Sequence, residues 1–279
     1  MTYFNSNGKI YTEGSLVIGA DNRGLRYGDG LFETMKMKND EIIFEDEHFA
    51  RLWKGMHILQ FDIPKHFTVE KLQHEISSLA KKNKHSNSAR IRLNIIRGDG
   101  GLYDIKNHSP GYIIQSWPLK NDYDSFNSNG LVIGIYDAAK KSCDVLSNLK
   151  HNNYLPYALA ALHAKKEKWN DAIVLNTNGR ICDTTIANIF VVKDKVLYTP
   201  SLEEGCVAGV MRKVIIKKLQ NTNWKVVETA LDIVDLLNAD EVFLTNSLYN
   251  TRWVQNIDDV IYKNSITQKI FTDIVQTIS

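Results

Sequence analysis

The most informative stretch of the chain is residues 146–154, LSNLKHNNY. Its single lysine, Lys150, follows an apolar, strand-like approach and precedes a helix that opens near Asn153. Most lysines are solvated surface residues, and that is the default interpretation for any one of them. A lysine that forms a Schiff base instead needs a pKa lowered by burial or by neighbouring cations, so that its amine is nucleophilic near neutral pH. Lys150 alone leaves both interpretations open.

Two stretches beyond the lysine add candidates. Residues 179–190, GRICDTTIANIF, hold one acidic residue, Asp183, among small and uncharged neighbours. Such an aspartate is commonly a helix N-cap; otherwise it is a buried carboxylate that needs a cationic partner, for which a protonated pyridine nitrogen would serve. Residues 205–212, GCVAGVMR, place a glycine turn just before a helix. The N–H groups at such a helix start bind anions, although a plain loop-to-helix junction is the simpler interpretation.

Arginines dominate the candidates in the first half. Arg51 lies on a predicted helix, where a surface salt bridge is the ordinary role. Arg90 and Arg92 are two apart on a predicted strand and therefore share a face, and Arg97 opens a glycine-rich turn. Three guanidinium groups so close together predict a carboxylate-binding wall, because each presents a planar fork. An exposed basic edge strand that guards against aggregation explains them equally well.

The composition is that of an ordinary globular protein. The 279 residues are 43% apolar and 24% charged, with 34 Lys+Arg against 32 Asp+Glu, so neither disorder nor a nucleic-acid partner is indicated. Cys143, Cys182 and Cys206 are far apart and the eight histidines are scattered, which excludes a disulfide framework and predicts no metal site. No apolar run approaches a membrane span and no signal peptide is visible, so we expect a cytoplasmic protein without a membrane partner.

Periodicity predicts two α+β domains, at 1–119 and 131–279, joined by a polar linker at 120–130. The expected helices are 45–59, a helix capped by Thr68, a helix from about 153 to 169, and one after Gly209. The expected strands are 3–6 and 9–11 around Asn7-Gly8, 32–38, 41–44, 89–96, 111–117, 131–136, 172–176, 189–192, 196–199 and 241–245.

Taken in order, these motifs resemble the fold-type IV pyridoxal-phosphate enzymes, the class IV aminotransferase family. The family includes branched-chain aminotransferases, D-amino acid aminotransferases and aminodeoxychorismate lyases. The likeness runs from residues 21–33, DNRGLRYGDGLFE, to residues 239–243, ADEVF. It implies a two-domain, D-amino acid aminotransferase-like α+β fold with pyridoxal 5'-phosphate in the cleft between the domains. It also implies a small amino or carboxylate substrate and a homodimer.

The resemblance implies a role for each motif. Lys150 becomes the lysine that binds the cofactor and moves protons at the substrate, and Asp183 faces the pyridine nitrogen, where the family usually has glutamate. Further cofactor contacts fall on Arg51, Asn188, Gly209, Val210, Met211 and Tyr154. The family often has threonine where this chain has Met211, and Tyr154 is one position nearer the lysine than in branched-chain enzymes. Substrate contacts fall on Arg90, Arg92, Arg97, Ser247 and Leu248.

Within the family, the contexts of Lys150 and Met211 look like those of the lyases, and Thr34 matches a threonine that lyases place near the reacting atoms. The resemblance thus implies release of pyruvate and p-aminobenzoate from 4-amino-4-deoxychorismate, in folate synthesis, with Thr34 relaying a proton. Thr34 is otherwise an ordinary strand residue.

The alternative is a class IV aminotransferase acting on branched-chain L-amino acids or D-amino acids. Arg92 aligns with a carboxylate-binding arginine of branched-chain enzymes, and Arg97 with one found in D-amino acid enzymes and lyases. A cofactor-free binding protein on the same fold is a third possibility, which the joint retention of Lys150, Arg51 and Asp183 argues against.

Overall fold

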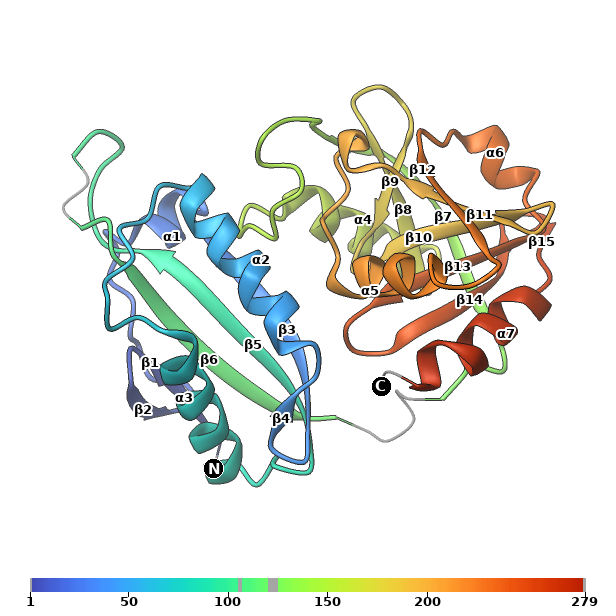
Figure 1. Cartoon of the computed structure of the whole chain (residues 1–279). Helices are drawn as coiled ribbons and strands as arrows, with labels where there is room; N and C mark the ends of the chain where they lie inside the picture. Colours follow the sequence, from blue (N-terminus) through green and yellow to red (C-terminus); the bar gives the residue numbers. More distant parts are fainter. Residues whose placement is uncertain (1, 105–106, 120–124, 278–279) are drawn as a thin grey trace. The chain divides into compact units, whose positions relative to one another are not determined.

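The computed structural model describes residues 2–104, 107–119 and 125–277 and separates into two compact units (Figure 1). Unit 1 is Met1–Asn121 with Leu149–Asn153, and unit 2 is Asp122–Asn148 with Tyr154–Ser279. Each unit combines a sheet with helices, which confirms the predicted α+β class. Residues 120–124 of the predicted linker lie outside the described residues, and residues 125–130 belong to unit 2.

Unit 1 is built on an antiparallel sheet of six strands in the order β2-β1-β6-β5-β3-β4. The strands are β1 (Tyr3–Ser6), β2 (Lys9–Thr12), β3 (Gly30–Lys38), β4 (Glu41–Ile42), β5 (Ser88–Arg97) and β6 (Pro110–Pro118). The helices are α1 (Arg23–Tyr27), α2 (Glu45–Ile58) and α3 (Val69–Lys82). The predicted turn between β1 and β2 is confirmed, because Asn7 and Gly8 both adopt positive φ, as a type I′ turn requires.

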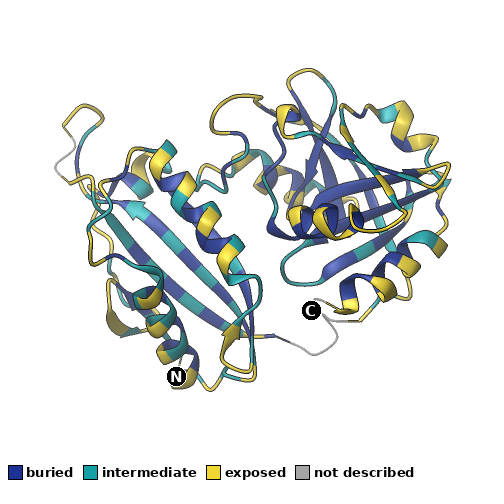
Figure 2. Cartoon of the chain, in the orientation of Figure 1, coloured by how far each residue is buried: buried dark blue, intermediate teal, exposed yellow. Residues whose placement is uncertain are grey.

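The core of unit 1 lies between α2, α3 and one face of the sheet. Alternate residues of β5 are buried in it, and Leu72, Ile76 and Leu79 of α3 meet them at helical spacing. The side chain of Thr68 accepts a hydrogen bond from the Lys71 N–H and caps α3, as predicted. Figure 2 shows the resulting pattern, with the helices buried toward the sheet and exposed on their outer sides.

Residues 149–153 extend the edge of this sheet. The Phe32 N–H donates to the Lys150 carbonyl at 2.8 Å, and the Asn152 N–H donates to the Gly30 carbonyl at 2.9 Å. Leu149 fills the core of unit 1. The sequence predicted this segment as part of the second domain; the structure groups it with the first unit because it pairs with the start of β3.

Unit 2 contains nine strands, eight of them in the order β12-β11-β10-β13-β14-β7-β8-β9, with β15 paired to β14. The strands are β7 (Leu131–Lys141), β8 (Asp171–Asn176), β9 (Ile181–Thr184), β10 (Asn188–Lys193), β11 (Val196–Pro200), β12 (Lys225–Thr229), β13 (Glu241–Asn246), β14 (Asn250–Ile257) and β15 (Val260–Ile261). The helices are α4 (Leu155–Lys166), α5 (Val210–Leu219), α6 (Ile233–Leu237) and α7 (Ser265–Asp273), with 3-10 turns η2 (Leu202–Glu204) and η3 (Val275–Thr277).

The strands β8, β9 and β10 are buried along almost their whole length, so side chains from both of their faces enter the interior of unit 2. Helix α4 covers β8 through Tyr157, Ala160 and Ala164. Because β9 is buried on both sides, Asp183 at its third position is carried into the interior.

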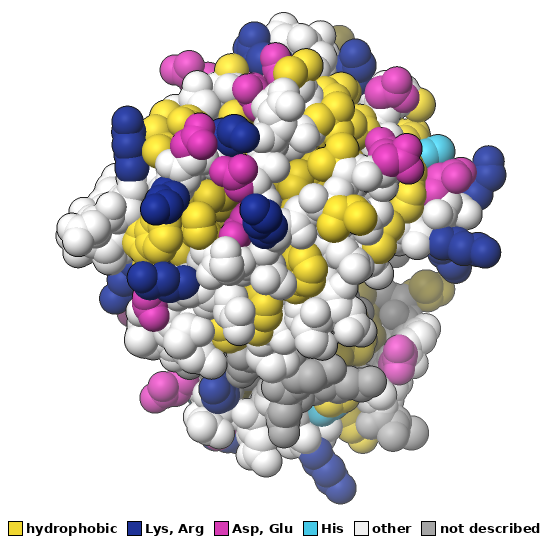
Figure 3. Space-filling model, turned by 90° about the vertical axis from the view of Figure 1, so that its right-hand side faces the viewer, with side chains coloured by type: hydrophobic (Ala, Val, Ile, Leu, Met, Phe, Trp, Pro, Cys, Tyr) yellow, Lys and Arg dark blue, Asp and Glu magenta, His cyan; other side chains and the backbone are white. Residues whose placement is uncertain are grey.

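On the face shown in Figure 3, basic and acidic side chains of the described residues are interspersed among hydrophobic ones. This mixture agrees with the formal net charge of +2. None of the helices in the described ranges is long and apolar enough to cross a membrane.

Candidate active site

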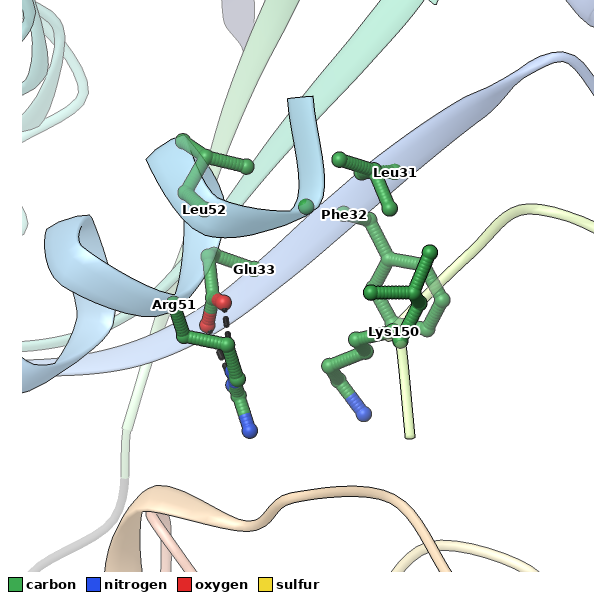
Figure 4. A pocket seen from close by; sticks show the side chains of 8 residues that line it. Leu31, Phe32, Glu33, Arg51, Leu52 and Lys150 are labelled. Atoms are coloured by element: carbon green, nitrogen blue, oxygen red, sulfur yellow. Dashed lines mark hydrogen bonds and ion pairs between the residues drawn. The ribbon is translucent and has the colours of Figure 1, made fainter. Parts of the chain in front are cut away.

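A pocket in unit 1 brings Lys150 and Arg51 together. It is lined by Leu31, Phe32, Glu33, Arg51, Leu52, Gly55, Leu149 and Lys150. Gly55 lets α2 approach β3, since a Cβ there would lie 2.8 Å from Leu31 Cδ1. Figure 4 shows the tips of Arg51 and Lys150 pointing to the same side, away from the helix.

A buried carboxylate, Glu33, fixes the orientation of Arg51. Its Oε1 accepts from Arg51 Nε at 2.8 Å, and its Oε2 accepts from Arg51 Nη2 at 2.5 Å and from His48 Nδ1 at 2.7 Å. Burial alone would raise the pKa of Glu33, but Arg51 and His48 together lower it to about 2. Burial lowers the pKa of His48, so the imidazole is neutral at pH 7 and donates from Nδ1. The sequence analysis did not identify Glu33 or His48 as site residues. An acidic residue within the strand-like segment 30–37 nevertheless indicates a carboxylate that is buried and needs a partner.

The face of the sheet away from α2 and α3 carries the lysine. Lys150 pairs opposite Phe32, whose ring centroid lies 4.5 Å from Lys150 Nζ and 4.0 Å from Arg92 Cζ. Thr34 is directly opposite Arg92 in the register of β3 and β5. Arg90 is on the same face, as predicted, and stacks over Trp117 at 4.9 Å. One surface of unit 1 therefore presents an amine, a hydroxyl and two guanidinium groups.

Arg97 does not belong to this surface, which corrects the predicted cluster of three. Strand β5 continues through residue 97, so the odd spacing from Arg92 turns Arg97 to the opposite face. Its side chain is 5% exposed and donates to Asp29 at 3.0 Å and to the carbonyls of Leu59 and Gln60. These bonds tie the end of α2 to the sheet and give Arg97 a structural role.

In unit 2, Asp183 is the centre of a buried hydrogen-bond network. Its Oδ2 accepts from the Tyr157 hydroxyl at 2.6 Å and from the Val207 N–H at 2.9 Å. Its Oδ1 accepts from Asn188 Nδ2 at 2.9 Å, which is the one bond to this oxygen among the described residues. A second acceptor position on Oδ1 thus remains for a ligand. Lys141 Nζ lies 3.5 Å from Oδ2.

Tyr157 is the tyrosine that contacts Asp183, whereas the cofactor contact expected of Tyr154 stays a prediction. The two rings stack with centroids 4.2 Å apart, and Tyr154 precedes α4 while Tyr157 lies in its first turn. Burial and the Asp183 charge raise the pKa of Tyr157 well above its usual value, so its hydroxyl stays a donor. A helical spacing of three from Tyr154 is the only sequence signal that pointed to Tyr157.

Asn188 links Asp183 to the turn before α5. Its Nδ2 also donates to the Val207 carbonyl at 2.8 Å, and a Cβ on Gly209 would lie 1.8 Å from its Oδ1. Glycine is therefore required at the cap of α5. The first helical N–H groups, those of Val210 and Met211, lie at this N-terminus, where the helix dipole favours an anion.

In the predicted carboxylate-binding turn at Ser247 and Leu248, the contact at Leu248 needs a correction, while the contact at Ser247 stays a prediction. The Leu248 N–H donates to the side-chain oxygen of Asn246 at 2.9 Å, and the Tyr249 N–H donates to the same oxygen at 3.1 Å. Leu248 therefore has no backbone donor to offer a substrate. The Asn side chain shapes the turn by mimicking a backbone acceptor.

The comparisons with known proteins agree with this geometry. Residues 30–257 match the family described as "Amino-transferase class IV". This chain belongs to the class IV aminotransferase family. The chain is 32% identical to the aminodeoxychorismate lyase of Vibrio harveyi over 84% of this chain and 85% of that protein. It is 29% identical to the aminodeoxychorismate lyase of Bacillus subtilis over 92% of this chain and 87% of that protein.

A branched-chain amino acid aminotransferase structure from Escherichia coli has the same fold, with a TM-score of 0.86 and 24% identity over 100% of this chain and 94% of that one. The predicted family and its fold are thereby confirmed. Membership makes the chain an enzyme of a cofactor-dependent family and implies pyridoxal phosphate.

The described residues of this class IV aminotransferase fit that cofactor. Asp183 keeps an acceptor position in a buried, hydrogen-bonded carboxylate, which suits a pyridinium nitrogen. Within unit 2, the N-terminus of α5 suits a phosphate. Within unit 1, the Arg51 guanidinium also suits a phosphate, and Lys150 offers an amine in the same pocket.

Proposed function

We propose that this class IV aminotransferase family member is a pyridoxal-phosphate-dependent 4-amino-4-deoxychorismate lyase that acts in folate synthesis in the cytoplasm. The observation that carries the proposal is the sheet face of unit 1, on which Thr34 and Arg92 lie opposite one another beside Phe32 and Lys150. Two relatives named aminodeoxychorismate lyase, at 32% and 29% identity, support it. The homodimer that the resemblance implies is part of the proposal, and light scattering of the purified protein tests it.

Each unit, taken by itself, carries groups that would suit part of the cofactor. Pyridoxal phosphate, when bound, supplies an electron sink for the carbon that bears the substrate amino group. Asp183 would keep the ring nitrogen protonated, supported by Asn188 and Tyr157. In unit 1, Arg51, oriented by Glu33, would bind phosphate through its guanidinium group. In unit 2, the N-terminus of α5 has the backbone N–H groups that suit a phosphate.

The substrate has two carboxylates, and the sheet face has two guanidinium groups on alternate positions of β5. Arg92 and Arg90 would each bind one carboxylate through a planar fork. The buried ring of Phe32 contacts both Arg92 and Lys150 and would help to fix the positions of these two side chains.

Two side chains would move protons in the reaction. Lys150 would remove the proton from the ring carbon that bears the amino group. The ring would become aromatic as the bond between the neighbouring ring carbon and the ether oxygen breaks, and the electron pair of that bond would leave with the enolpyruvate oxygen. The Thr34 hydroxyl would relay a proton to the methylene carbon of the departing pyruvate. One proton leaves the ring and one is gained by pyruvate, so p-aminobenzoate and pyruvate together balance the substrate.

The test is p-aminobenzoate formation by cofactor-saturated protein given 4-amino-4-deoxychorismate, with Lys150→Ala as the blank. Product above the blank is expected. Thr34→Val keeps the shape but removes the hydroxyl and should lower kcat by about 10²-fold or more, whereas Thr34→Ser should retain most of the activity. Absence of product, with amino transfer from D- or branched-chain L-amino acids to 2-oxoglutarate, would overturn the lyase.

A further inference from the structure

A buried lysine outside the motifs lies beside the Asp183 carboxylate. Lys141 is the last residue of β7 and is 6% exposed. Its Nζ donates to the Ser147 carbonyl at 2.9 Å, lies 3.5 Å from Asp183 Oδ2, and lies 5.1 Å from the centroid of the Tyr157 ring. Burying an ammonium group is costly, so an interior lysine with three such partners is a specific arrangement.

The surroundings of Asp183 make Lys141 its counter-ion. The groups that donate to the carboxylate from the other elements, Tyr157, Asn188 and the Val207 backbone, are all neutral. The neighbouring thiol of Cys182 is also neutral, because burial raises its pKa well above the usual value. Among the described residues, Lys141 is the one cation within 4 Å of Asp183.

This pairing changes what Asp183 can offer to a cationic ring nitrogen. An unpaired buried carboxylate attracts a pyridinium with its full charge, whereas a carboxylate already paired with an ammonium presents a dipole. The backbone also holds the lysine in place, because the Thr177 N–H donates to the Lys141 carbonyl at 2.9 Å. The backbone at Lys141 is thereby fixed, and an ammonium group that moved away from Asp183 would lose its bond to the Ser147 carbonyl.

We propose that Lys141 is a positioning residue that neutralises the charge of Asp183 in the cofactor-free protein. Through this pairing it weakens the attraction between Asp183 and the protonated ring nitrogen of pyridoxal phosphate. The inference rests on the proposed function for the identity of the cofactor. It predicts that removal of the lysine charge makes cofactor-free protein less stable. It also predicts that, without the Lys141 charge, the affinity for pyridoxal phosphate depends more strongly on the ring nitrogen.

The experiment compares dissociation constants for pyridoxal 5'-phosphate and for its 1-deaza analogue, in which CH replaces the ring nitrogen. The ratio of the two isolates the contribution of that nitrogen, because both molecules carry the same aldehyde and phosphate. We expect Lys141→Met to raise the preference for the natural cofactor about tenfold or more. Its cofactor-free Tm should fall below that of Lys140→Met, which removes a charge from the exposed neighbouring position.

Two further variants separate charge from packing. Lys141→Arg keeps the charge and should retain the wild-type ratio, while Lys141→Gln removes the charge but keeps a donor for Ser147 and should behave like Lys141→Met. Lys141→Gln also serves if Lys141→Met does not fold. An unchanged ratio in either uncharged variant overturns the inference, even in an active lyase. A shifted ratio in a protein that makes no p-aminobenzoate overturns the proposed function and leaves the inference standing.

Discussion

Replacing Glu33 by glutamine tests whether the buried pair with Arg51 stabilises unit 1. The carboxylate is 1% exposed and accepts two bonds from Arg51 and one from His48. Its pKa falls from 4.5 to about 2 on folding, which corresponds to about 3 kcal/mol of the free energy of unfolding at pH 7. Removing one partner of a buried pair typically costs about 3–5 kcal/mol, so the two estimates agree.

The sign of the pH dependence follows from the lowered pKa. The contribution of Glu33 is complete above the unfolded value of 4.5 and is lost as the pH falls toward 2. The difference in unfolding free energy between wild type and Glu33→Gln should therefore be largest at pH 7. It should narrow by about 1 kcal/mol at pH 3.5.

Urea unfolding at both pH values, combined with hydrogen exchange of the α2 amides, measures this difference in unit 1. Glu13→Gln makes the same chemical change at an exposed position of unit 1 and should leave stability nearly unchanged. A Glu33→Gln protein within about 0.5 kcal/mol of wild type at pH 7 would refute the reasoning. So would a difference that stays constant down to pH 3.5.

Three other changes have defined outcomes. Tyr157→Phe removes a 2.6 Å bond to buried Asp183 and should cost about 1–3 kcal/mol in denaturant unfolding and weaken cofactor binding; unchanged values for both would exclude the role given to this hydroxyl. Arg97→Gln should lower the free energy of unfolding by about 3 kcal/mol and leave KM nearly unchanged. A large rise in KM with wild-type stability would instead show that Arg97 binds the substrate. Iodoacetamide at pH 8 should label exposed Cys143 before Cys206, whose pKa burial raises to about 12, and peptide mapping that finds the reverse order would contradict the burial described.

Much of the fold could be predicted from patterns within single segments of the sequence. The ends of α2 were predicted within one residue, and α3 begins directly after its predicted cap, Thr68, because apolar spacing and capping are properties of the segment itself. The strands β9, β12, β14 and β15 and the helices α1, α6 and α7 were missed. β9 is buried at every position and therefore shows no alternation, and it is only four residues long.

Some features of the candidate site follow from the spacing of residues within one strand, whereas others depend on contacts between strands that are distant in the sequence. The shared face of Arg90 and Arg92 follows from a spacing of two, and the opposite face of Arg97 would have followed had the strand been extended by one residue. The contact of Lys141 with Asp183 joins β7 to β9, and no local pattern specifies it. Such contacts depend on sheet order, which the motifs did not supply.

The short segment Leu149–Asn153 also decides how the chain can be cut. The polypeptide passes from unit 1 to unit 2 and back before it continues into α4, so no single cleavage yields both units intact. A fragment ending at residue 121 would leave the Gly30 and Phe32 backbone groups unpaired at a sheet edge, which invites association with other chains. Fusing a copy of residues 149–153 to that fragment through a flexible linker should restore its solubility. The repaired edge would also bring the Lys150 amine back to unit 1.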